Sequence, residues 1–249
     1  MSYIQSFLSS SIQLHISWIL ILAVLYIVIH QYRHKPLNRI IDIYLNYIPV
    51  LTHEFGHILF NKISGGKARD LVIVAKPSER DQTSQQGYAI TQSSSRLSQI
   101  ITTLGGYIMP PLMLFLGYLA VTANYPSIFI AAYLFIFCYF VILTSRKLLP
   151  IIILLMLIVL LYGIFQSNDQ ELIFYFVSIS YHFILGMLLG EVLQSSWTIF
   201  KLTFFNRDVE WDGTTLNELT RCPTFFFSTL WIAINLYTVY KLFTVVISF

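Results

Sequence analysis

Long apolar runs separated by short polar stretches dominate the sequence. Seven runs are long and apolar enough to be considered as membrane spans, namely residues 12–31, 40–61, 99–121, 127–144, 148–166, 170–190 and 223–247. A helix needs about 20 mostly apolar residues to cross a bilayer. The pattern therefore predicts an all-α polytopic membrane protein with about seven transmembrane helices, which form a single membrane-embedded domain over residues 1–249.

Two polar stretches interrupt this pattern. Residues 62–98 contain two β-like runs, 71–75 and 87–91, around a polar turn. Such an arrangement is typical of a hairpin with a long loop, so we expect a small β-hairpin between the second and third spans. Residues 192–222 mix aromatic and polar side chains, as segments at a membrane interface do.

Glu191 directly follows the Gly186-x-x-x-Gly190 motif at the end of the sixth run. That spacing of glycines lets two membrane helices approach closely. The carboxylate is either solvated at a helix end or functional, and the helix-end interpretation is favoured.

Composition agrees with a membrane protein and excludes other classes. The chain is 56% hydrophobic and only 11% charged, whereas soluble domains are about 25% charged. A net charge of +3 without a basic cluster gives no reason to expect a nucleic-acid partner. Cys138 and Cys222 lie far apart, and Cys138 is inside an apolar run, so we expect free thiols. The expected surroundings are the lipid bilayer.

Lys and Arg residues in the loops indicate an orientation. If the chain starts in the cytosol, the inside loops are 62–98, 145–147 and 191–222, which hold most of the basic residues. The outside loop then holds Arg33, Lys35 and Arg39. Because cytosolic loops carry an excess of Lys and Arg, this arrangement is favoured and places the 62–98 hairpin loop on the cytosolic side.

The second run contains the motif His53-Glu54-Phe55-Gly56-His57. Positions i and i+4 of a helix lie on one face, so both imidazoles can bind one metal ion. Glu54 flanks the same face and is placed to act as a general base rather than as a ligand. Ionisable residues inside a membrane span are costly and usually functional. The motif therefore predicts a zinc site of one ion with hydrolytic chemistry.

A catalytic zinc ion usually takes three protein ligands, so a third must come from elsewhere. The 191–222 segment returns to the same side and carries Asp208, Glu210, Asp212 and Glu218. Asp212 is the best candidate because Gly213 beside it permits a close approach of the backbone. Residues 214–216 would equally suit Asp212 as a helix N-cap, and Asp208 and Glu210 remain alternatives.

Three motifs together resemble the site-2 protease family of intramembrane zinc metalloproteases, in particular its compact bacterial peptidase branch. They are His53-Glu54-Phe55-Gly56-His57, Gly105-Gly106-Tyr107 with Pro110-Pro111, and Trp211-Asp212-Gly213 followed by Pro223 and Trp231. The resemblance covers about 50–123 and 186–235, and we take 40–123 and 186–247 as the core of the domain.

The resemblance implies that His53, His57 and Asp212 bind zinc and that Glu54 is the catalytic base. It also implies that the hairpin pairs with an unwound segment of a membrane-protein substrate. Gly87, Gly105, Gly106 and Pro110 are the candidates for positioning that substrate, although the third-span residues would equally serve helix packing. The chain departs from the family in lacking its usual asparagine after the Gly105-Gly106 pair and any room for a PDZ-like domain.

The expected activity is zinc-dependent endopeptidase cleavage in or near a transmembrane segment, in the bacterial cytoplasmic membrane, with the active site toward the cytosol. One alternative is a catalytically silent scaffold or chaperone of the same fold, for which Glu54 would be unnecessary. Another is a metal transporter, although transporters line a path with ligands from several spans. The sequence does not indicate the oligomeric state.

Overall fold

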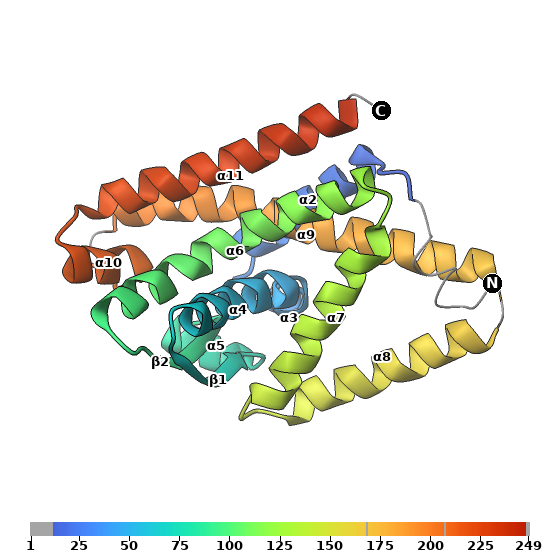
Figure 1. The fold of residues 1–249 in the computed structure, drawn as a ribbon, viewed down its shortest axis with the longest axis horizontal. Coiled ribbons are helices and arrows are strands. Elements are labelled where there is room, and N and C mark those ends of the chain that lie inside the picture. The colour runs from blue at the N-terminus through green and yellow to red at the C-terminus, as the bar shows by residue number, and fades with distance from the viewer. Residues whose placement is uncertain (1–11, 168, 207, 248–249) are drawn as a thin grey trace.

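The computed structural model describes residues 12–167, 169–206 and 208–247. Helices dominate, and one small sheet lies at one end of the bundle (Figure 1). The elements are α2 (Ile16–Gln31), α3 (Pro36–Leu45), α4 (Tyr47–Ile63), β1 (Lys67–Ile73), α5 (Pro77–Thr83), β2 (Gly87–Gln92), α6 (Arg96–Thr122), α7 (Pro126–Leu143), α8 (Leu148–Gln166), α9 (Gln170–Phe204), α10 (Asp212–Thr220) and α11 (Thr224–Ile247).

Four helices within the described residues, α6, α7, α9 and α11, are long and apolar enough to cross a membrane. The apolar helices α2 and α8 are shorter. These helices identify an integral membrane protein, but they do not confirm the predicted count of about seven spans.

The second predicted span, 40–61, is not one helix. It divides at Asn46 into α3 and α4. Asp42 and Asn46 are almost fully buried there, and the Asn46 amide donates to the Asp42 carboxylate at 2.6 Å. The hydroxyl of Tyr26 in α2 lies 2.6 Å from the Asn46 side-chain oxygen. Buried polar groups require such partners, so this cluster fixes the turn between the two helices.

Helix α3 turns the chain back along the end of α2. His30 contacts Asp42 and Tyr26 contacts Asn46, so α2 and α3 are antiparallel. At 1.5 Å per residue, the 10 residues of α3 extend about 15 Å, which is half the apolar thickness of a bilayer. Helix α3 therefore reverses the chain without crossing.

As a result, α2 and α4 run in the same direction. Helix α2 is parallel to α9, whereas α6 is antiparallel to both α4 and α9 (Figure 1). For α2 and α9 the contacts are Leu22 with Gly186 and Tyr26 with Gly190, and for α4 and α6 they are Gly56 with Gly105 and Asn61 with Thr102. Between α6 and α9, Gly117 contacts Tyr181 and Leu185.

The predicted orientation of the first loop is therefore wrong. It placed Arg33, Lys35 and Arg39 on the side opposite the hairpin. In the structure, Arg39 in α3 donates to Asp81 in α5, within the hairpin loop, at 2.5 Å. The basic residues after α2 and those of the hairpin therefore lie at one end of the bundle.

The predicted hairpin is present, and it packs along α4. Strands β1 and β2 pair antiparallel from Lys67 opposite Gln92 to Ile73 opposite Gly87. Leu71 and Val72 are fully buried. The connecting loop holds a helix, α5, which begins at Pro77; proline suits this first helical position because its missing N–H would be unpaired there anyway.

Helix α9 is longer than predicted, since its 35 residues continue past Gly190 to Phe204. Polar side chains of its second half face α11: the Asn235 amide donates to the Val192 carbonyl at 3.2 Å and to Ser196 at 2.9 Å. Glu191 consequently lies in mid-helix against Tyr26 and not at a solvated helix end. Residues 192–204 of the predicted interfacial segment 192–222 thus continue helix α9.

Candidate metal centre

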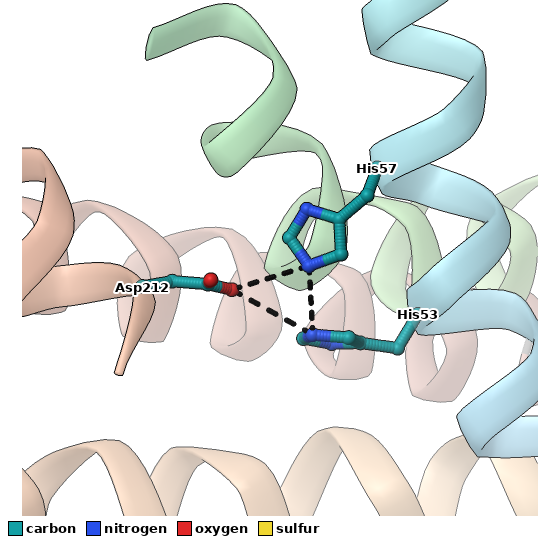
Figure 2. Close-up of side chains that lie close together, drawn as sticks. All are labelled: His53, His57 and Asp212. Atoms are coloured by element: carbon teal, nitrogen blue, oxygen red, sulfur yellow. Dashed lines mark hydrogen bonds and ion pairs between the residues drawn. The ribbon is translucent and has the colours of Figure 1, made fainter. Parts of the chain in front are cut away.

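Helix α4 presents His53 and His57 on one face, one turn apart. Their Nε2 atoms lie 3.2 Å from each other, and both rings point toward the same space (Figure 2). The two rings meet edge to face with centroids 4.9 Å apart. The i, i+4 spacing in the sequence thus produces the converging pair of nitrogen donors that it predicted.

Asp212 approaches this pair from α10, a separate helix (Figure 2). Its Oδ2 atom lies 3.6 Å from His53 Nε2 and 3.4 Å from His57 Nε2. Asp212 is the first residue of α10, and the residue before it, Trp211, occupies the N-cap. The N-cap interpretation of Asp212 is therefore wrong. Asp208 and Glu210 are exposed and lie outside this cluster of donors, which is the one group among the described residues whose spacing could hold a metal ion.

The spacing of the three donors fits one tetrahedral zinc ion. With bonds of about 2.0–2.1 Å, neighbouring ligand atoms of a tetrahedral site lie about 3.3–3.4 Å apart. The three observed separations are 3.2, 3.4 and 3.6 Å. Two imidazoles and one carboxylate are also a donor set that zinc accepts, with a fourth position left for water. His53, His57 and Asp212 are therefore the residues that would hold the metal.

The surrounding groups orient the ligands. His57 Nδ1 lies 2.9 Å from the carbonyl oxygen of Thr102 in α6. If Nδ1–H donates to that carbonyl, the lone pair of Nε2 is directed toward Asp212 and His53. The His53 ring packs edge to face on Tyr107, with centroids 4.8 Å apart. No sequence motif pointed to Thr102, because its contribution is a backbone carbonyl oxygen.

Electrostatics keep Asp212 ionised. Burial by itself would raise the pKa of this carboxyl, but the neighbouring His57 and His53 imidazoles outweigh burial and hold the pKa well below its usual value. An anionic carboxylate is the form that can bind a cation and partly neutralise it.

Glu54 faces the same site without joining the donor group. Its side chain is 9% exposed and interacts with the backbone of Ala89 in β2. A cavity of about 730 Å³ is lined by Glu54, both histidines, Asp212 and the β2 residues Gly87, Tyr88, Ala89 and Thr91. A smaller cavity of about 190 Å³ adjoins Glu54 and reaches Glu191 and Gln194 of α9. Glu54 thus lies between the donors and a strand.

The four residues predicted to position a substrate have different surroundings. Gly87 lines the main cavity, close to Val50 and Glu54. Gly106 faces the two histidine rings, and Gly105 contacts the backbone of Gly56 where α6 crosses α4. Pro110 is buried inside α6 and lines neither cavity. The structure thus brings Gly87 and Gly106 to the site and places Gly105 and Pro110 in helix packing.

Comparison with protein families supports this centre. The model of the Peptidase M50B-like family matches residues 18–242, which span α2 to α11. Curated proteins and solved structures gave no match. Because the family match covers most of the chain and includes all three donors, we conclude that the chain belongs to the Peptidase M50B-like family, the site-2 protease family of intramembrane metalloproteases.

Proposed function

We propose that this protein is a zinc-dependent endopeptidase that cleaves a membrane-protein substrate in or near a transmembrane segment. The observation that carries the proposal is the tetrahedral spacing of the His53, His57 and Asp212 donor atoms beside Glu54. Membership in a family of zinc metalloproteases supports the same chemistry.

Each residue at the site has a separate role in the proposed hydrolysis. A zinc ion, when bound, would polarise the scissile carbonyl and lower the pKa of a water molecule. Glu54 accepts a proton from the attacking water and delivers it to the nitrogen of the leaving amine. Asp212 offsets part of the positive charge of the centre, and the Thr102 carbonyl keeps the His57 ring in position.

Strand β2 is the proposed docking element for the substrate. The sheet has only two strands among the described residues, so the second edge of β2 pairs with no strand there. Gly87, Tyr88, Ala89 and Thr91 border the cavity that contains Glu54. An extended peptide added to this edge would form main-chain hydrogen bonds and would lie across the donors. A helical substrate must therefore unwind before cleavage.

The proposed orientation places the hairpin end of the bundle in the bacterial cytosol. The loops at this end contain the basic residues of the hairpin and, after the correction above, also Arg33, Lys35 and Arg39. The positive-inside rule favours a cytosolic location for that end. The start of α2 then lies toward the opposite face, which reverses the original placement of the first span.

Glu54→Gln is the direct test of the mechanism. We expect the variant to retain one zinc ion per chain and to lose cleavage by about 10²–10⁴-fold, since general acid–base catalysis contributes that much. Zinc is measured by elemental analysis of the purified chain, and cleavage by comparing membrane-protein fragments in cells that carry either form. Glu218→Gln is the matched control, because Glu218 is exposed and outside the donor group.

Other outcomes identify the alternatives. Cleavage at the wild-type rate by Glu54→Gln would contradict the mechanism. If the chain binds zinc but cells with the wild-type protein show no fragment that is missing from cells with Glu54→Gln, the protein is a silent scaffold or chaperone. Zinc uptake by proteoliposomes that is insensitive to Glu54→Gln would indicate a metal transporter.

A further inference from the structure

Another polar cavity lies away from the metal donors, between the end of α2, the start of α3 and the α5 segment. Its volume is about 420 Å³. Its lining is Arg33, His34, Arg39, Asp42, Arg80 and Asp81, together with residues 84–86. No residue of the zinc donor group or of the proposed general base contributes to this lining.

Arg80 is the central feature of this cavity. Its side chain is only 10% exposed, and its Nε donates to the Val74 carbonyl at 2.7 Å. Both terminal nitrogens are buried and have no hydrogen-bond partner in the described structure. Burying a charged group without hydrogen bonds is costly, and burial lowers the pKa of this guanidinium even though Asp42 opposes the shift.

The carboxylate nearest to Arg80 is already engaged. Asp42 Oδ1 lies 2.8 Å from His30 Nδ1 and accepts from the Asn46 amide at 2.6 Å. Its Oδ2 is 3.6 Å from an Arg80 terminal nitrogen, which is beyond hydrogen-bonding distance. Asp42 therefore supplies charge compensation to Arg80 but no good hydrogen bond.

The other cations leave the cavity with excess positive charge. Arg39 donates to the exposed Asp81 at 2.5 Å. Arg33 is exposed and forms no ion pair with a carboxylate in the described part of the chain; its side chain contacts His30 at 2.9 Å. Three guanidinium groups thus face two carboxylates, and a bound anion would balance the remaining positive charge.

We propose that this cavity binds a phosphate group, either that of an anionic phospholipid or free inorganic phosphate. Planar guanidinium groups match the oxygen spacing of phosphate and form bidentate, charge-assisted hydrogen bonds with it. The cavity lies where the apolar helix α2 ends and the chain turns back. Basic pockets beside membrane helices are suited to lipid headgroups.

Occupation of this cavity would also restrain the proposed docking strand. Gln85 lines both this cavity and the main cavity at the donors, and Gln86 lines this cavity and the smaller one beside Glu54. Strand β2 begins at the next residue, Gly87. A bound phosphate group would hold residues 84–86 against α3 and so fix the start of β2.

The test uses the full-length chain purified in a neutral detergent and three probes: dihexanoyl phosphatidylglycerol, sodium phosphate, and sodium chloride at matched ionic strength. We expect the lipid, or phosphate, to bind and to raise the midpoint of thermal unfolding, whereas chloride does not. Arg80→Gln should weaken that binding about tenfold or more, because hydrogen bonds to charged groups contribute at least that factor. Arg33→Gln should weaken it in the same direction.

Arg69→Gln is the matched control, since Arg69 is an exposed hairpin arginine that bonds Gln92 and lies outside the cavity. Arg33 is a surface residue, so its variant remains informative if Arg80→Gln fails to fold. Binding of the lipid alone identifies a headgroup site, and binding of inorganic phosphate identifies a site for the free anion. Absence of binding by both phosphate-bearing probes, or equal binding by wild-type, Arg80→Gln and Arg33→Gln chains, overturns the proposal.

Discussion

Gly106 shows how strongly one position controls the donor geometry. A Cβ atom built there would lie 2.4 Å from His57 Nε2 and 2.7 Å from His53 Nε2. Those are the two atoms that face Asp212. The absence of a side chain at position 106 is therefore a structural requirement for the converging histidine pair.

Gly106→Ala should consequently disrupt metal binding while all three donors remain in the chain. We expect zinc affinity to fall by more than about tenfold, which is the range seen when groups that support ligands are changed. Competition with a chromogenic chelator measures that affinity. Gly163→Ala in α8 is the control, because a Cβ there meets no atom within 4 Å; equal zinc affinity in both variants would refute this role of Gly106.

The sequence was informative about individual residues where a local rule applied. Helical spacing alone predicts that His53 and His57 lie together, and their Nε2 atoms are 3.2 Å apart in the structure. Asp212 could not be separated from Asp208 and Glu210 by spacing, because the choice depends on how the chain turns into α10. Gly213 beside it favoured Asp212, and the family resemblance strengthened that choice. The contact of His57 with Thr102 could not be predicted from the sequence, since it uses a backbone carbonyl, which every residue has.

At the scale of elements, an aromatic cluster holds α10 in place. Trp231 of α11 is fully buried and packs on Tyr107 of α6 and on Trp211, with centroids 4.7 and 5.9 Å away. Trp211 is the residue before Asp212. Packing between α6, α10 and α11 therefore determines where the third donor lies.

Trp231→Ala should separate this packing from the ligands themselves. Removing a buried tryptophan costs about 3–5 kcal/mol of stability, and we expect zinc affinity to fall as α10 loosens. Thermal unfolding and chelator competition measure the two effects. Phe226→Ala, on the same helix but 56% exposed, should change neither; unchanged zinc affinity in a destabilised Trp231→Ala chain would show that α10 is held by other contacts.

Elements were predicted well where hydropathy is uniform and poorly where polar groups are buried in pairs. The hairpin follows from its two β-like runs. The division of 40–61 was missed because Asp42 and Asn46 satisfy each other inside the bundle, a contact that hydropathy does not represent. The extension of α9 was missed for the same reason, since Ser196 is paired with Asn235 of α11.

For the whole molecule, the reversal at α3 gives a topology that can be tested directly. With Cys138 and Cys222 replaced by serine, single cysteines are placed at His34, Gln85 and Asn124, all of which are exposed. A membrane-impermeant maleimide should label His34→Cys and Gln85→Cys from one face and Asn124→Cys from the other, because α6 crosses between them. If His34→Cys is labelled from the same face as Asn124→Cys, the reversal at α3 is contradicted and residues 40–61 cross the membrane as first predicted.

The separation of the donors along the chain has a consequence for biogenesis. A ribosome synthesises His53 and His57 well before Asp212 and the packing residue Trp231. If the three donors form the hydrolytic centre that we propose, a growing polypeptide has no such centre until Asp212 and the helices that position it, α10 and α11, have been made. The translocon and neighbouring nascent proteins are thereby spared premature cleavage. A ribosome-stalled chain that ends before residue 212 should accordingly retain no zinc through purification.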